Sequence, residues 1–317
     1  MVILVVRSVD TVSIHSHLPR AVWHERLRAH EARVASYADA FVARRSVGAK
    51  HPVHDFLFTY YSFSPGKLKQ WVPPLGVWLD GVGEEDLIDH PWLGSGKFIS
   101  TADLCGLDES KLDARTRGTA QWIATLCRNI LDRPARFRCF GLHEWAMVYR
   151  QTEEEIRHNQ HRLRLPPDEL SRFVESQALC CTHYDAFRFF TPEARPLNSV
   201  APTYQQRPDL EQGACLHANM DLYKWSAKLW PWIGSDIVAD AFLLALEGRD
   251  LDMRASPYDL RDLGYDPVCI ETPQGREQYE AGQRALAEKA RPLRERLLAA
   301  AEEISSPNSA SPGTASL

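Results

Sequence analysis

Apolar side chains recur three or four residues apart along most of this 317-residue chain, which is the spacing of one face of an α-helix. The spacing is seen in five segments: 20–46, 110–131, 214–232, 235–253 and 275–304. Glycines and short β-prone runs interrupt it between residues 76 and 104, where we expect loops with one small hairpin. The pattern therefore predicts a mainly α fold, a compact helical domain with a small β-hairpin or irregular region around residues 76–104.

Local signals refine this prediction. The apolar segment 137–151 is interpreted as a buried helix, and Pro292 is expected to interrupt the last helix of the chain. Ser235 and Asp236 precede a strongly apolar face and are candidates for capping its helix. The chain is expected to divide into a loose N-terminal extension, a single helical domain and a disordered, low-complexity tail, over residues 1–19, 20–304 and 305–317.

The charge balance limits the partners of the chain. Its 37 basic and 42 acidic residues give a net charge of −5, which argues against a surface that follows nucleic acid throughout, although a local basic patch can still bind DNA. Seven scattered cysteines without a CxxC pair, and no secretory segment, indicate free thiols in a reducing cytoplasm. No stretch approaches the roughly 18–20 apolar residues of a membrane span, so no membrane partner is expected. The sequence does not indicate an oligomeric state.

Five of the twelve histidines lie in the aromatic-rich middle of the chain: His143, His158, His161, His183 and His217. Two or three imidazoles with a carboxylate would suit zinc or non-haem iron, and Glu155 stands three residues before His158, the spacing used by di-iron bundles. The second copy of that spacing is missing from the sequence, and so is an HExxH motif. We therefore expect no cofactor and no metal. If a metal binds, the candidate ligands are His143, His158, His183 and His217.

One predicted helix carries a polar face. His217, Asp221 and Lys224 lie on the same side of segment 214–232, opposite its apolar stripe. This face is either a solvated ion pair or the wall of a cleft. Asn219 and Trp225 beside it make the cleft a plausible alternative.

A basic island lies between residues 133 and 164. Its seven arginines outnumber its four glutamates, which leaves a local charge of +3. Such an island can hold phosphates, or its members can form ordinary ion pairs along helices. The arginines are Arg133, Arg136, Arg138, Arg150, Arg157, Arg162 and Arg164.

Five extended blocks carry a family resemblance: KHPVHDFLFTYYS (50–62), CFGLHEWAMVYR (139–150), CTHYDAFRFFTPEARPLN (181–198), CLHANMDLYKW (215–225) and LDMRASPYDL (251–260). They resemble a bacterial family labelled 3-methyladenine DNA glycosylase, and the similarity would cover roughly residues 20–300. The resemblance implies a DNA repair enzyme that flips an alkylated purine out of the duplex and hydrolyses its N-glycosidic bond.

The chemistry of such a reaction suggests roles for individual residues. A 3-alkylated adenine is a cation and favours electron-rich rings, for which the candidates are Trp145, Tyr149 and Trp225. The oxocarbenium-like state needs a carboxylate, and Asp185 is the first choice, with His183 beside it and Glu144 or Asp221 as substitutes. Arg188 would pair either with a phosphate or with Asp185. The other expected substrate contacts are His143, Arg157, His158, His217, Asn219 and Asp221.

The secondary structure of residues 181–190 decides how Asp185 is used. In a helix, Asp185 and Arg188 share one face and can form an ion pair. In a strand, His183 and Asp185 share one side and Arg188 lies on the other. Both geometries remain open from the sequence.

Two further function classes also remain open. One is a small-molecule enzyme, possible with or without a metal held by histidines and carboxylates. The other is a binding module for nucleic acid or a ligand that uses the arginines without catalysis. The sequence has no GxSxG elbow, P-loop or GxGxxG fingerprint, which argues against serine hydrolases and nucleotide-binding α/β enzymes.

Overall fold

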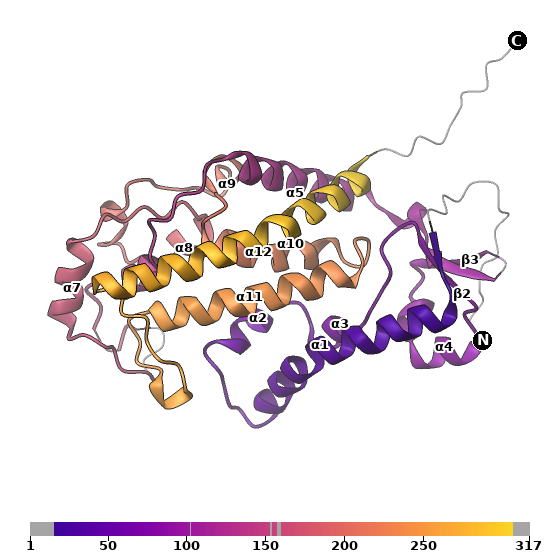
Figure 1. Cartoon of the computed structure of the whole chain (residues 1–317), viewed down its shortest axis with the longest axis horizontal. Helices are drawn as coiled ribbons and strands as arrows, with labels where there is room; N and C mark the ends of the chain where they lie inside the picture. The colour runs from indigo at the N-terminus through magenta and orange to yellow at the C-terminus, as the bar shows by residue number, and fades with distance from the viewer. Residues whose placement is uncertain (1–15, 102, 153, 157–159, 307–317) are drawn as a thin grey trace, which may run out of the picture.

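The computed structural model describes residues 16–101, 103–152, 154–156 and 160–306 (Figure 1). It is 58% helical with only a small sheet, which confirms the mainly α prediction. The α-helices of the described residues are α1 (Arg20–Ser46), α2 (His54–Tyr60), α3 (Pro65–Lys69), α4 (Glu84–Asp89), α5 (Ala114–Asp132), α6 (Leu142–Ala146), α7 (Pro167–Glu175), α8 (Tyr184–Phe187), α9 (Arg207–Leu210), α10 (Leu216–Leu229), α11 (Ser235–Ala255) and α12 (Pro273–Ser305). The strands are β1 (Ser16–Leu18), β2 (Val77–Asp80), β3 (Phe98–Thr101) and β4 (Leu104–Leu107).

Four long helices form the centre of the molecule. Helix α12 packs against α5, α10 packs against α11, and α12 also contacts α10 and α11. In Figure 1, α11 and α12 run side by side along the long axis. Helix α11 buries Val238, Phe242 and Ala245 in the main core, as expected for a helix with an apolar stripe. Helices α1 and α2 pack against α11 on its other side.

The small sheet has the strand order β1-β2-β4-β3. Strands β3 and β4 form an antiparallel hairpin in the region where the sequence predicts one, and β1 pairs with β2 in parallel. Trp23 of α1 packs against this sheet in a second, smaller core that includes Trp71 and Leu79. Part of the segment expected to be loose, residues 16–18, is therefore held in the sheet. Residues 1–15 lie outside the described residues.

The predicted helix over residues 137–151 is wrong in its extent, because the structure has only α6 there. Phe140 and Gly141 have φ angles of 47° and 73°, and Arg150 has a φ of 55°. These left-handed backbone conformations are incompatible with a continuing α-helix. The chain consequently enters and leaves α6 through sharp turns, and this places the five residues of α6 as a short insert against α11.

The expected interruption at Pro292 is also wrong, because α12 continues through it. Proline removes one backbone hydrogen bond from the helix. Pro292 lies on the exposed face, so water can satisfy the carbonyl left without a partner. The end of α12 at Ser305 agrees with the predicted boundary, and residues 307–317 lie outside the described residues.

Ser235 begins α11, but Gly234 occupies the capping position. The Ser235 hydroxyl instead accepts from the backbone N–H of Val72 and donates to the carbonyl of Gln70, which ties α11 to the segment after α3. Among the described residues, no helix is both long and apolar enough to cross a membrane.

Candidate functional site

A cavity of about 790 Å³ lies where the end of α1, α2, α6 and α8 meet, and we call it the aromatic cavity. Its volume is within the range of small-molecule binding sites. The aromatic rings in its wall belong to Phe41, Phe56, Tyr60, Phe189 and Tyr258. The polar part of the wall contains Glu144, Asp185, His217 and Arg249. The aromatic cavity thus combines several aromatic rings with a wall in which about half of the residues are polar or charged.

A second cavity of about 1130 Å³, which we call the basic pocket, also has His217 in its wall. Four arginines line it: Arg136, Arg138, Arg276 and Arg284. Four cysteines, Cys139, Cys180, Cys181 and Cys215, are also part of its wall, together with His143. His217 therefore belongs to the walls of both cavities.

The first of two buried charged groups surrounds Arg207, and we call it the Arg207 cluster. The Arg207 side chain is 1% exposed and donates to three carboxylates: Asp185 at 2.9 Å, Glu211 at 2.6 Å and Asp221 at 2.7 Å. Lys224 adds a second cation, with its Nζ 2.5 Å from Asp185 Oδ2. Each of these carboxylates therefore has a cation in direct contact.

The Asp185 carboxylate is already paired with two cations, which makes it a poor proton acceptor for a general base. Burial alone would raise its pKa, but the hydrogen bond from Lys224 and the charges of Lys224 and Arg207 keep this pKa below its usual value. Arg188, which directly follows the short helix α8, lies 3.6 Å away from the Asp185 carboxylate. Residues 184–187 are helical, so the helical alternative for this segment holds and Asp185 faces cations.

His183 also belongs to the Arg207 cluster. Its Nε2 lies 3.2 Å from Asp221 Oδ2, and both side chains are 1% exposed. Burial would raise the pKa of Asp221, but Lys224, His183 and Arg207 hold it well below the usual range. The polar face of α10 is therefore buried at Asp221, where it belongs to the Arg207 cluster, rather than being exposed to solvent.

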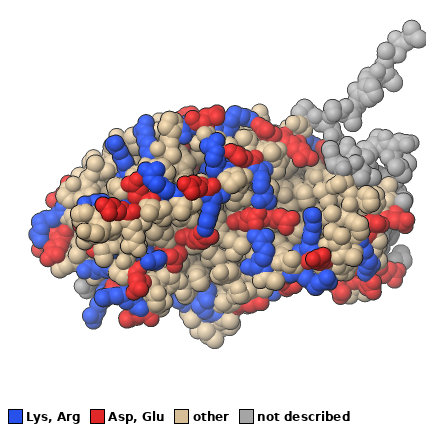
Figure 2. All heavy atoms as spheres, in the orientation of Figure 1, with Lys and Arg blue, Asp and Glu red and all other residues tan. Residues whose placement is uncertain are grey.

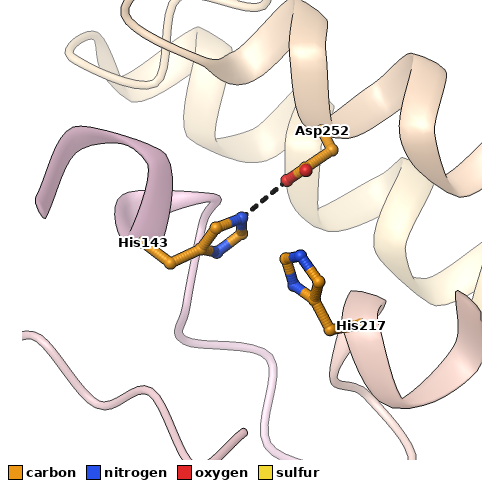
Figure 3. A group of neighbouring side chains, drawn as sticks. All are labelled: His143, His217 and Asp252. Carbon is orange, nitrogen blue, oxygen red and sulfur yellow. Dashed lines mark hydrogen bonds and ion pairs between the residues drawn. The ribbon is translucent and has the colours of Figure 1, made fainter. Parts of the chain in front are cut away.

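The second buried charged group, the Arg249 cluster, lies between α6 and α11. Arg249 Nη1 donates to Glu144 Oε1 at 2.9 Å and to Asp252 Oδ2 at 2.8 Å. The other Asp252 oxygen accepts a 2.8 Å hydrogen bond from His143 Nε2 (Figure 3). All four side chains are buried. Glu144 also lines the aromatic cavity, and its Oε2 has no hydrogen-bond partner among the described residues.

His217 stands between the two clusters. Its ring lies edge-on to His143, with centroids 4.4 Å apart, and is stacked on His183 at 5.4 Å. Neither ring nitrogen has a hydrogen-bond partner within the described part of the chain. Burial, and then the neighbouring charge of His143, lower the pKa of His217 to about 3. His217 is thus a neutral imidazole with an available lone pair next to two cavities.

Potential ligand atoms converge at His217. One donor atom each from His143, His217 and Asp252 lie within 4.8 Å of one another, and these residues come from α6, α10 and α11 (Figure 3). His183 faces Asp221 and is not part of this group. His158 lies outside the described residues.

The three aromatic residues expected to hold the base lie away from the aromatic cavity. Trp145 is fully buried and donates to the carbonyl of Ala255. Tyr149 donates to Glu175. Trp225 packs beside Arg207 and Lys224 in the Arg207 cluster, as their cation–π contacts show.

Four further predicted substrate contacts lie outside the aromatic cavity or outside the described residues. Asn219 accepts a 2.7 Å hydrogen bond from Arg294 Nη2 in the interior of the bundle. Arg188 is 44% exposed and reaches Tyr60. Arg157 and His158 are not among the described residues.

The basic island does not form one continuous patch. Arg164 pairs with Glu271 and Arg150 with Glu175, while Arg133 donates to the backbone carbonyl of Pro208. Arg136 and Arg138 line the basic pocket instead. On the face shown in Figure 2, basic and acidic side chains are interspersed.

The sequence interpretation gave no role to Arg207, Glu211, Arg249 or Asp252. A signal was present for the last two, because a charged pair three residues apart interrupts the otherwise apolar face of α11. Arg207 carried no such signal. Its carboxylate partners Asp185 and Asp221 lie 22 and 14 residues away in the chain, and only the fold brings them together.

A comparison with known proteins found no match: no family model, no curated protein and no solved structure is significantly similar to this chain.

Proposed function

We propose that the protein hydrolyses the N-glycosidic bond of an alkylated purine and binds the base in the aromatic cavity. The observation that carries this proposal is the position of Glu144. Its carboxylate lies in the wall of a cavity lined by aromatic rings, and one of its oxygens is free of hydrogen bonds among the described residues. The family resemblance of the sequence points to the same reaction.

The aromatic cavity suits a flat, cationic base. Phe56 and Tyr60 stack with centroids 4.9 Å apart and form one wall, and Phe189 and Tyr258 add two further rings. Arg249 lies 4.3 Å from the Phe56 centroid and already covers this ring, so the base would stack on Tyr60, Phe189 or Tyr258. Alkylation of a purine ring nitrogen places positive charge on the base, and the rings would favour that form over the neutral base.

Glu144 would act on the attacking water. Cleavage of the bond between the base and C1′ develops positive charge on the sugar, which a nearby carboxylate stabilises. Glu144 takes a proton from water, the resulting hydroxide forms the new bond to C1′, and the base leaves with the bonding electrons. An alkylated cationic base leaves as a neutral molecule and needs no added proton. Asp185 is less suited to this step, because Lys224 and Arg207 already bind it.

The wall of the aromatic cavity also offers cations for a phosphate backbone. Arg45 and Lys50 line it, are exposed, and have no side-chain partner among the described residues. Cations beside a base-binding cavity can bind the phosphates on either side of a flipped nucleotide in DNA. We therefore infer DNA, rather than a free nucleoside, as the substrate.

The test compares release of free 3-methyladenine from methylated duplex DNA by the wild type, Glu144→Gln and the control Glu277→Gln. Glu277 is an exposed carboxylate of α12. We expect Glu144→Gln to lose at least about 100-fold in rate, as for a general base, while Glu277→Gln keeps the wild-type rate. Wild-type release at the spontaneous rate would refute the proposal, and salt-sensitive DNA binding without release would instead indicate a binding module. A parallel reaction with the methylated nucleoside tests the inference of DNA as substrate.

A metal-dependent reaction on a small molecule is the second candidate. The specific observation in its favour is the convergence of donor atoms from His143, His217 and Asp252 beside the aromatic cavity. Base release that persists after chelation would favour the first candidate.

A further inference from the structure

We propose that His143, His217 and Asp252 form a binding site for a divalent transition-metal ion of the zinc type. Their donor atoms lie within 4.8 Å of one another, and Figure 3 shows the three side chains pointing toward a common space from three helices. This inference does not depend on the N-glycosidase proposal, because it concerns metal binding alone.

The donor set fits this class of ion. Two imidazole nitrogens and one carboxylate oxygen are ligands that Zn²⁺ and Fe²⁺ use in catalytic sites. Metal–ligand bonds of about 2.0–2.1 Å place tetrahedral donors about 3.3 Å apart. His143 Nε2 and Asp252 Oδ1, now 2.8 Å apart, would separate by about 0.5 Å as the metal replaces the proton between them, and the His217 donor, within 4.8 Å of both, would approach by up to about 1.5 Å. His217 can supply this movement, because no hydrogen bond to a described residue fixes its ring nitrogens.

Two of the three candidate ligands also have partners on the atoms that would not bind the metal. Asp252 binds His143 through Oδ1 and Arg249 through Oδ2, so Oδ1 can turn to a metal while Arg249 keeps the carboxylate in place. His143 has its second nitrogen, Nδ1, 3.7 Å from Cys139 Sγ. Partners on the non-ligating atoms orient a carboxylate or an imidazole for metal binding.

The neighbouring pair His183 and Asp221 is a comparison site at which we expect no metal to bind. His183 and Asp221 are as close to each other as a metal site would need, but Arg207 Nη2 donates to the same Asp221 oxygen at 2.7 Å. A guanidinium thus already occupies the position of a cation there. In the Arg249 cluster the guanidinium lies on the far oxygen of Asp252, and Glu144 balances its charge.

The position of His217 also leaves room for a further ligand. With three protein ligands, a zinc-type ion keeps one open coordination position for water or a substrate, as in catalytic sites. Because His217 lines both the aromatic cavity and the basic pocket, that position would be reachable from the cavities.

The experiment measures metal content and affinity on the full chain. Purified wild type is stripped with chelator, dialysed against Zn²⁺ and analysed for bound metal, and Co²⁺ is used in parallel for its visible absorption. We expect about one equivalent of Zn²⁺ and the intense absorption of a low-coordinate Co²⁺ site. Less than about a tenth of an equivalent would overturn the proposal, and this readout needs no variant.

Two variants test the assignment of the ligands. His217→Ala should weaken binding at least about 100-fold, since it removes a direct ligand, and circular dichroism checks that it folds. His90→Ala, which removes a half-buried histidine beside Trp23 and Trp92 at the small sheet, should bind like the wild type. Wild-type affinity in folded His217→Ala, or equal loss in His90→Ala, would overturn the assignment.

Discussion

The Arg207 and Arg249 clusters contain the same kinds of side chain but arrange them differently. In the Arg207 cluster the guanidinium lies at the centre and contacts three carboxylates. In the Arg249 cluster the guanidinium lies at one edge. His143 and Asp252 face His217 there, and no arginine or lysine of the described chain lies between them. A central cation completes a charge network, whereas a cation at the edge leaves donor atoms directed at a shared space.

This difference separates a stabilising role from a chemical one. A buried ion network is strongly destabilised when one partner is removed, because the remaining charges stay buried without compensation. Donor atoms that face a shared space contribute less to folding and are available for a ligand. We therefore assign the Arg207 cluster mainly to stability, and the Arg249 cluster with His217 mainly to chemistry. Four substitutions can break or sharpen this comparison.

Arg207→Met should have the largest effect on stability. It leaves Asp185, Glu211 and Asp221 without their shared cation in the interior, and we expect a loss of about 3–5 kcal/mol in the free energy of unfolding. Denaturant unfolding followed by circular dichroism measures it. A loss below about 1 kcal/mol would remove the distinction between the clusters.

Arg249→Met should be destabilising by a smaller amount, about 2–4 kcal/mol. Glu144 loses its only ion-pair partner among the described residues, but Asp252 keeps its hydrogen bond from His143. The same unfolding experiment compares the two arginine variants directly. A larger loss than in Arg207→Met would show that the cation at the edge is the more important one for folding.

Asp185→Asn should cost about 1–2 kcal/mol at neutral pH, since it replaces charged hydrogen bonds to Lys224 and Arg207. The pKa of Asp185 is below 3.8 in the folded protein, so its stabilising contribution is complete above that pH and is lost as the pH falls through the folded-state pKa. The stability difference between wild type and variant should therefore shrink below about pH 3.8. If the difference in the free energy of unfolding stayed constant down to low pH, the charge of Asp185 would not be the source of its stabilising effect on the folded protein.

His217→Ala should have the smallest effect on the stability of the metal-free protein, within about 1 kcal/mol, because its ring nitrogens make no hydrogen bond to a described residue. Excess Zn²⁺ should stabilise the wild type, by about 2.7 kcal/mol at 100 times the Kd, and leave the variant unchanged. Thermal unfolding with and without Zn²⁺ measures both effects. A variant that Zn²⁺ stabilises as much as the wild type would contradict the assignment of His217.

Long periodic segments made much of the fold predictable from the sequence. The helix over residues 20–46 has the predicted boundaries, since its apolar spacing runs without interruption to the end of α1. The failure at 137–151 has a different cause. The left-handed conformations of Phe140 and Arg150 are imposed by packing in three dimensions, and neither residue type indicates them. Gly141 was a weak sign in the sequence, because glycine readily adopts the left-handed conformation that it has here, with a φ of 73°.

The candidate site was predictable only in part, because ion pairs across long separations leave no trace in local patterns. Glu144, Asp185 and His217 were singled out and all line the aromatic cavity. The arginine partner of Glu144 lies 105 residues away in the chain, so the pairing depends on how α6 docks on α11. The aromatic candidates such as Trp145 were chosen by residue type alone, and the large ring is instead used to fill the core.

The shared position of His217 has a consequence for how the two cavities influence each other. Because His217 belongs to the walls of both, a ligand in the aromatic cavity and a ligand in the basic pocket would contact the same imidazole. Occupancy of one cavity is therefore expected to change binding in the other, without any movement of a helix.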